Sequence, residues 1–146
     1  MITLKDIRLA INNKLKKLGI SVKSQDIEKG FARPSFSVFF DEVKIETLES
    51  QIETSLIVRI YYFTEVEGSE ASLEILDMQQ NLPLLFGNNL KVKDRAIHIS
   101  DIDSSVVDGV FMFEFNLLFE QSIESNDPNE NAELMQTLHM KINESE

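Results

Sequence analysis

The chain has 146 residues, of which 42% are hydrophobic and 27% charged, values typical of one soluble domain with a buried core. It contains no cysteine, which excludes a disulfide scaffold, a cysteine nucleophile and thiolate metal ligands. A formal net charge of −11 argues against non-specific nucleic-acid binding, and no apolar run approaches the ~20 residues that span a bilayer.

The charge is distributed unevenly along the chain. Residues 1–33 carry a net charge of +5, residues 34–119 a net charge of −10 and residues 120–146 a net charge of −6. On a monomer, this pattern indicates only a well-solvated surface. In a ring of identical subunits, opposite charges on two faces would instead help to orient neighbours. The sequence leaves both interpretations open.

An amphipathic helix is predicted over residues 3–18. Its apolar residues recur at spacings of three and four, which places them on one face: Leu4, Ile7, Ile11, Leu15 and Leu18. Thr3 and Asp6 have the spacing of a capping box at the start of this helix, and Gly19 supplies a stop at its end.

The segments that follow predict strands. Residues 20–24 indicate a short strand, and residues 25–34, with Gly30 and Pro34, indicate a loop. Residues 35–46 alternate between apolar and polar side chains, and residues 53–63 are rich in branched and aromatic side chains, with Arg59 expected to point outward. The sequence does not place the turn between these two strands, because residues 46–53 contain neither glycine nor proline.

A second helix is predicted over residues 69–82, with Ser69 as its cap. Its predicted face holds Leu73, Leu76 and Gln80, with Ile75 and Leu82 nearby. Pro83 is expected to end or kink this helix. Short strands are predicted over residues 90–93 and 95–102, and Asp108-Gly109 is the strongest hairpin signal in the chain. The strand after that turn places five apolar side chains on one face: Phe111, Phe113, Phe115, Leu117 and Phe119.

These elements predict an α+β fold, in which a mostly antiparallel sheet packs against an N-terminal helix and a central helix. We expect a single domain over residues 1–122. Residues 123–146 are mostly polar and contain Pro128, so we expect a linker followed by a C-terminal tail or a short terminal element.

No pattern in the sequence marks a catalytic or cofactor site. Nucleophile elbows and phosphate-binding glycine loops are missing, and no carboxylate pair has the local spacing of an acid and a base. His98, Asp101 and Asp103 form the most metal-like group, but alternation along a strand would point His98 away from both carboxylates. We therefore expect neither an enzyme nor a cofactor or metal site.

Residues 29–36 form a local cluster that has two interpretations. Gly30 and Pro34 fit a loop that enters a strand, with aromatic side chains anchoring that loop in the core. Alternatively, Lys29, Phe31 and Arg33 lie at a contact with another subunit, where a guanidinium pairs with an acidic surface.

Around this cluster, the sequence resembles the tail terminator family of tailed phages and phage-derived tail-like particles. The resemblance covers residues 2–8 (ITLKDIR), 27–36 (IEKGFARPSF), 106–113 (VVDGVFMF) and 133–138 (ELMQTL), in the order of the family. Residues 45–100 resemble the family only in their pattern of strands and a helix, and residues 82–86 depart from it.

The resemblance implies a structural virion assembly protein without enzymatic activity. It would form a hexameric ring on the tail tube protein, stop tube polymerisation and offer a surface to the head or neck. Sheath or neck proteins would be further partners, and neither a specific nucleic-acid sequence nor a membrane would be bound. Assembly would take place in the host bacterial cytoplasm, since the N-terminus shows no secretory signal. The final location would be the upper end of the tail.

Under this resemblance, Lys29, Phe31 and Arg33 are candidate residues facing a neighbouring subunit or the tube. Arg33→Glu would then weaken ring assembly and leave the fold intact. Acidic residues within 34–119 would line the lumen of the ring and keep passing DNA from sticking.

Two other classes stay open. Another head–tail connector or neck protein would bind the portal side instead of the tube. A small cytoplasmic binding module would remain a monomer or dimer and ignore tube protein.

Overall fold

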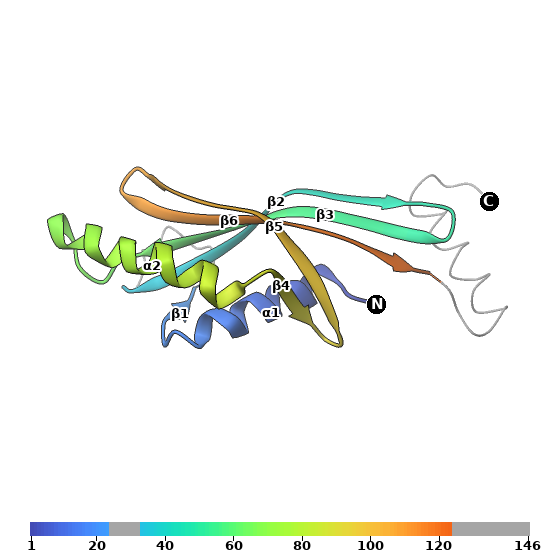
Figure 1. The fold of residues 1–146 in the computed structure, drawn as a ribbon, viewed down its shortest axis with the longest axis horizontal. Coiled ribbons are helices and arrows are strands. Elements are labelled where there is room, and N and C mark those ends of the chain that lie inside the picture. The colour runs from blue at the N-terminus through green and yellow to red at the C-terminus, as the bar shows by residue number, and fades with distance from the viewer. Residues whose placement is uncertain (24–32, 124–146) are drawn as a thin grey trace.

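The computed structural model describes residues 1–23 and 33–123, and within them shows a curved six-stranded sheet with two α-helices (Figure 1). In chain order the elements are α1 (Leu4–Lys16), β1 (Ser21–Val22), β2 (Ser35–Thr47), β3 (Gln51–Phe63), the 3₁₀ turn η2 (Gly68–Glu70), α2 (Ala71–Phe86), β4 (Asn89–Val92), β5 (Arg95–Val107) and β6 (Val110–Ser122). The predicted α+β class is confirmed. Residues 124–146 lie outside the described residues, so the domain boundary at 122 stays a prediction.

The strands are ordered β1-β2-β3-β6-β5-β4, and every pair is antiparallel except β1 with β2. Two long hairpins form the centre of the sheet. The first turns at residues 48–50, where the Leu48 N–H donates to the Gln51 carbonyl at 2.7 Å. The second turns at Asp108 and Gly109, which both have positive φ (52° and 77°), as a type I′ turn requires. The predicted Asp108-Gly109 hairpin is confirmed.

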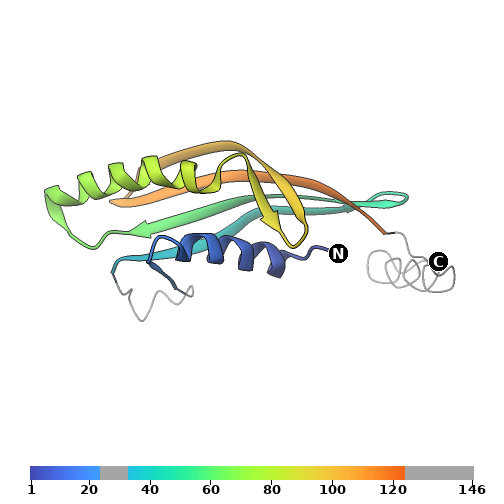
Figure 2. The ribbon, with the colours of Figure 1, turned by 60° about the horizontal axis from the view of Figure 1, so that its bottom comes forward.

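Both helices cover the same face of the sheet, α1 beside β1 and β4 and α2 across β6 (Figure 2). The five β6 side chains predicted to share a face are all buried there, together with Ile7, Ile11 and Leu15 of α1. Phe86 of α2 lies 5.9 Å from the Phe113 ring and 5.2 Å from the Phe115 ring. The strict alternation along β6 therefore supplies the floor on which both helices pack. Neither described helix is long and apolar enough to cross a membrane.

The capping box predicted for the first helix is confirmed. The Asp6 N–H donates to Thr3 Oγ1 at 3.2 Å, and the Thr3 N–H donates to Asp6 Oδ2 at 2.9 Å. These backbone contacts, with Lys93 at 3.0 Å, hold the pKa of Asp6 below its ordinary value. Two N–H groups that a helix start leaves without partners are thereby satisfied.

Two expectations about the second helix are wrong. Ser69 does not cap it: its carbonyl accepts from the Ser72 hydroxyl at 2.8 Å, and α2 begins at Ala71 after the turn η2. An end of the helix at Pro83, one of the two outcomes expected there, is also wrong, because α2 continues to Phe86. The burial of Leu82 and Phe86 in the core offsets the single helical hydrogen bond that proline cannot donate.

The predicted face of this helix is right for Leu82, which is buried, and wrong for its other two leucines. Leu73 and Leu76 are exposed, whereas the side chains packed on the sheet are Met78, Leu82 and Phe86. The helix ends at Gly87, whose φ of 65° few other residues adopt and whose N–H donates to the Pro83 carbonyl at 2.9 Å.

Candidate functional site

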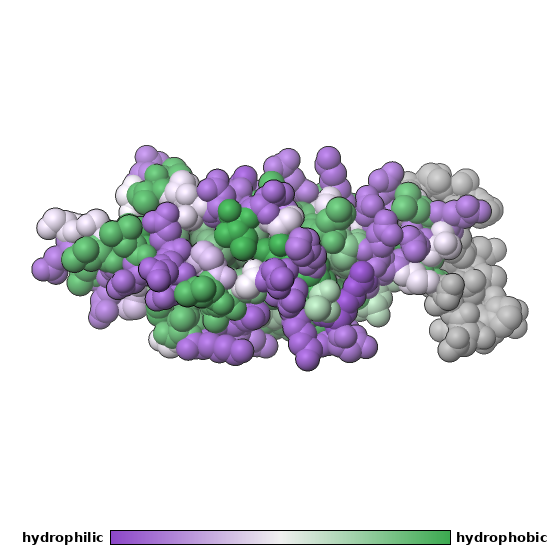
Figure 3. Space-filling view, viewed as in Figure 1, coloured by the Kyte–Doolittle hydropathy of each residue, from purple (hydrophilic) through white to green (hydrophobic). Residues whose placement is uncertain are grey.

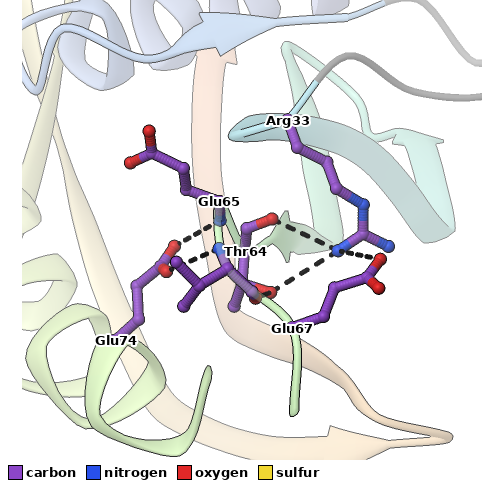
Figure 4. Close-up of polar contacts among 6 residues, drawn as sticks. Arg33, Thr64, Glu65, Glu67 and Glu74 are labelled. Atoms are coloured by element: carbon purple, nitrogen blue, oxygen red, sulfur yellow. Dashed lines mark hydrogen bonds and ion pairs between the residues drawn. The ribbon is translucent and has the colours of Figure 1, made fainter. Parts of the chain in front are cut away.

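Of the three residues expected at a subunit contact, the structure describes only Arg33, since Lys29 and Phe31 lie outside the described residues. Arg33 lies two residues before the start of β2 and joins Pro34 by a cis peptide bond. Its side chain reaches the segment that follows β3 (Figure 4). Nη1 donates to the Thr64 carbonyl at 3.2 Å and lies 3.9 Å from Glu67 Oε1. Arg33 is therefore engaged within its own chain and ties the start of β2 to the end of β3.

Glu74 of α2 holds the same segment from the other side. Its carboxylate accepts hydrogen bonds from the backbone N–H groups of Glu65 at 2.7 Å and Val66 at 3.2 Å (Figure 4). It also accepts from the Tyr62 hydroxyl at 2.5 Å. Burial raises the pKa of Glu74, but the hydroxyl and the two N–H groups lower it by more, so the net pKa lies below its ordinary value. Burial and this carboxylate together raise the pKa of Tyr62.

These contacts form a structural clamp on the loop that leads into α2. Arg33 and Glu74 grip residues 64–67 from two different elements, which sets the position of the helix relative to the sheet. In the clamp, the Tyr62 hydroxyl and the Glu74 carboxylate are engaged with each other and with backbone groups, which gives these contacts the role of a structural support.

The side of α2 that faces away from the sheet is unusually apolar. Leu73, Leu76 and Leu84 are 66%, 59% and 74% exposed. Their spacing places them along one stripe of the helix, opposite the residues that pack in the core. In Figure 3, hydrophobic side chains lie exposed between hydrophilic ones over the region where Figure 1 places α2. We call this surface, together with exposed Glu70 and Asp77 beside it, the acidic leucine face.

The outward side of α1 is basic. Lys5, Leu9 and Lys16 follow helical spacing on the side opposite the core, and Leu9 is 59% exposed. Beside them, the Arg8 guanidinium lies 5.1 Å from the centre of the Phe40 ring. A shallow hollow of about 380 Å³ opens here, lined by Leu4, Lys5, Arg8, Leu9 and Phe40. We call these five residues with Lys16 the basic α1 face.

The face of the sheet that the helices do not cover carries charged side chains on its central strands. Arg59 bridges β2 and β6 through ion pairs with Asp41 and Glu114, so the prediction that it points outward is confirmed. Nearer the end of these strands, Glu53 pairs in register with Glu46 and Glu120. Partial burial and the neighbouring Glu120 raise the pKa of Glu53. We call these three glutamates the acidic row.

His98 lies exposed on β5, and Asp101 Oδ2 accepts from Asn116 Nδ2 at 2.9 Å. Among residues 1–23 and 33–123, the structure groups no three histidine, aspartate or glutamate side chains as a metal site.

Comparison with known proteins identifies the family of this chain. A family model described as phage tail terminator protein matches residues 6–130. The chain belongs to the phage tail terminator family. Among solved structures, one chain aligns with 87% of this chain and 100% of its own length, at 13% identity and a TM-score of 0.38, which is too distant to carry an argument. No curated protein matches this chain.

Membership of this family identifies the chain as a structural protein of phage tail assembly, with its place in a virion or tail-like particle. The resemblance noted in the sequence is thereby confirmed.

The acidic leucine face and the role of Glu74 in the clamp were not predicted from the sequence. The first had a signal: residues 71–86 place leucines on two opposite sides of one helix, and a helix can bury only one side against its own sheet. Glu74 had none, because its partners come from β3 and the loop, which only the folded chain brings together.

Proposed function

We propose that this protein caps the tail tube, stops its polymerisation and forms the surface that is joined to the head or neck. The observation that carries this proposal is the family match over residues 6–130. On this proposal, copies of the chain form a ring on the last ring of tube protein, with six subunits as the resemblance implies.

The physical requirement for a cap supports the proposal. A growing tube end exposes head-to-tail contacts that would repeat without limit, so a cap must match that end and offer the next tube subunit no equivalent surface. A chain with chemically different surfaces, such as the acidic leucine face and the basic α1 face, suits that asymmetry.

Lys29, Phe31 and Arg33 remain proposed contact residues for a neighbour or the tube. The contacts of Arg33 change the expected effect of its substitution. Arg33→Glu removes the hydrogen bond to Thr64 and puts a carboxylate beside Glu67, so it would loosen the 64–67 loop as well as any contact. Lys29→Glu is therefore the better test of this surface.

Tail tube protein is the proposed direct partner, with sheath or neck and head-completion proteins as further candidates. Assembly in the host bacterial cytoplasm is part of the same proposal. Acidic side chains within 34–119 are proposed to line the lumen, where negative charge would keep passing DNA from sticking.

The testing experiment polymerises tail tube protein with and without this chain and measures tube lengths by electron microscopy. We expect shorter tubes with a ring of this protein at one end, and a length that falls as the ratio of this chain to tube protein rises. An unrelated protein of similar net charge, added at equal concentration, serves as control. Tubes of unchanged length without bound protein would contradict the proposal.

That negative result would favour the alternative of a neck or connector component, which binding to portal protein would test. A chain that binds neither tube nor portal protein would instead fit a small cytoplasmic binding module.

A further inference from the structure

We propose that the acidic leucine face of one copy docks on the basic α1 face of a second copy. This proposal rests on the proposed ring of identical subunits and names the two surfaces through which its members meet.

The first observation is the stripe of three leucines on α2. Leu73, Leu76 and Leu84 are each more than half exposed, although the opposite side of the same helix already supplies the core. A helix that is apolar on two sides has a second surface to bury. The clamp by Arg33 and Glu74 makes this surface rigid, because it fastens the loop that leads into the helix.

The second observation is the charge around that stripe. Residues 60–90 contain five acidic side chains and neither a lysine nor an arginine. Glu70 and Asp77 are exposed on the same side of α2 as the leucines. Two copies of this surface would repel each other, so a symmetric contact of α2 with α2 is disfavoured.

The third observation is the complementary surface on α1. Residues 1–23 contain six basic side chains against the single carboxylate of Asp6, which Lys93 and the capping box already engage. Leu9 supplies an exposed apolar side chain among Lys5, Arg8 and Lys16, next to the hollow of about 380 Å³. An apolar centre with a charged rim of opposite sign is the complement that the acidic leucine face requires.

Within one copy, the acidic start of α2 and the basic start of α1 lie apart. Figures 1 and 2 place the start of α2 and the start of α1 toward opposite ends of the molecule. The side-chain contact between the helices instead joins Lys14 Nζ of α1 to the Leu85 carbonyl near the end of α2, at 3.1 Å. A contact between different surfaces of two copies is heterologous, and repeated copies of such a contact close into a ring when the rotation fits.

The absence of cysteine makes this contact directly testable by disulfide trapping. A chain with Leu9→Cys is mixed with an epitope-tagged chain with Leu73→Cys, under mild oxidation, alone and in the tube-capping mixture. We expect the mixed dimer to exceed either homodimer by about tenfold, because the like-charged pairings are repelled. Leu118→Cys in place of Leu73→Cys is the matched control, since Leu118 is 58% exposed on the sheet face that the helices leave uncovered.

Charge exchange provides the second arm. Lys5→Glu with Arg8→Glu in the Leu9→Cys chain should lower the mixed dimer by about tenfold. Glu70→Lys with Asp77→Lys in the Leu73→Cys chain should restore it. Glu46→Lys with Glu53→Lys makes the same change of charge in the acidic row and should not restore it. Circular dichroism of each variant shows that the fold is retained.

Three outcomes would overturn the inference: a mixed dimer no stronger than that with Leu118→Cys, Leu73→Cys homodimers as abundant as the mixed dimer, or rescue by the acidic row. Tubes that are capped although the mixed cross-link does not form would contradict this inference and agree with the proposed function. Copies that form the mixed cross-link but leave tubes uncapped would agree with this inference and contradict the proposed function.

Discussion

The carboxylate of Glu74 accepts hydrogen bonds from three donors that lie 8 to 12 residues before it in the chain. The Tyr62 hydroxyl comes from the end of β3, and the N–H groups of Glu65 and Val66 come from the loop that follows. Because the acceptor is charged and the Tyr62 donor is part-buried, this residue has more influence on stability than a surface glutamate.

We predict that Glu74→Ala lowers the free energy of unfolding by about 1–3 kcal/mol, because it removes three hydrogen bonds to a charged acceptor, one of them from the part-buried Tyr62 hydroxyl. Glu74→Gln should cost less, since its amide oxygen still accepts. Urea unfolding of the three proteins measures both effects. Equal stability of the alanine variant and the wild type would show that the clamp contributes nothing.

The pH dependence follows from the lowered pKa of Glu74. A carboxyl whose folded pKa lies below its value of 4.5 in the unfolded chain stabilises the fold fully above about pH 4.5. That stabilisation is lost as the pH falls through the folded pKa. The stability difference between wild type and Glu74→Gln should therefore shrink below pH 4.5 and stay constant near neutrality.

At the scale of elements, α2 shows how far a sequence pattern specifies packing. That a helix forms here follows from the helix-forming residues, although it runs past Pro83 to Phe86. Its orientation does not, because leucines lie on both sides and either side fits a sheet. The core contacts of Leu82 and Phe86, and the hydrogen bonds that Glu74 accepts, decide which side of the helix faces the sheet.

Leu82 and Leu84 provide a matched pair for this point. Leu82 is fully buried, so Leu82→Ala should cost about 2–5 kcal/mol of unfolding free energy. Leu84 lies on the acidic leucine face, so Leu84→Ala should change stability by less than about 0.5 kcal/mol. The same Leu84→Ala change should weaken the mixed cross-link. Thermal unfolding and cross-link yield separate the two roles, and equal destabilisation by both substitutions would refute the assignment of faces.

Other elements follow directly from the sequence. The alternation along β6 predicts which side chains are buried, because successive side chains of a strand point to opposite faces of the sheet. The capping box of Thr3 and Asp6 and the turn at Asp108-Gly109 are also local. Pro83 was misjudged because the tertiary burial around it outweighs its local preference.

At the scale of the whole molecule, the uneven charge of the sequence becomes a separation in space. The basic residues of the N-terminal segment lie on and beside α1, and the acidic residues of 65–77 lie at the start of α2. Each surface is enriched in one sign, which is the basis of the proposed pairing of unlike surfaces between two copies.

We predict that the mixed Leu9→Cys and Leu73→Cys cross-link weakens by several-fold when salt is raised from physiological levels to about 1 M, where the Debye length falls to ~3 Å. The comparison is the yield of disulfide dimer at the two salt concentrations, with unfolding by urea measured at both. A yield that does not change with salt would indicate a contact held by leucine burial alone.

The sequence by itself determined the α+β class, the first helix with its cap, the hairpin at Asp108-Gly109, the buried side of β6 and, through its resemblance, the family. These depend on residues near one another in the chain or on local backbone preferences. Only the tertiary structure decided which side of α2 is buried, which groups Arg33 and Glu74 engage, and where the charged surfaces lie. Those features depend on contacts between segments distant in sequence, and the competing arrangements differ by burial and hydrogen bonds that form only when the sheet and both helices are assembled.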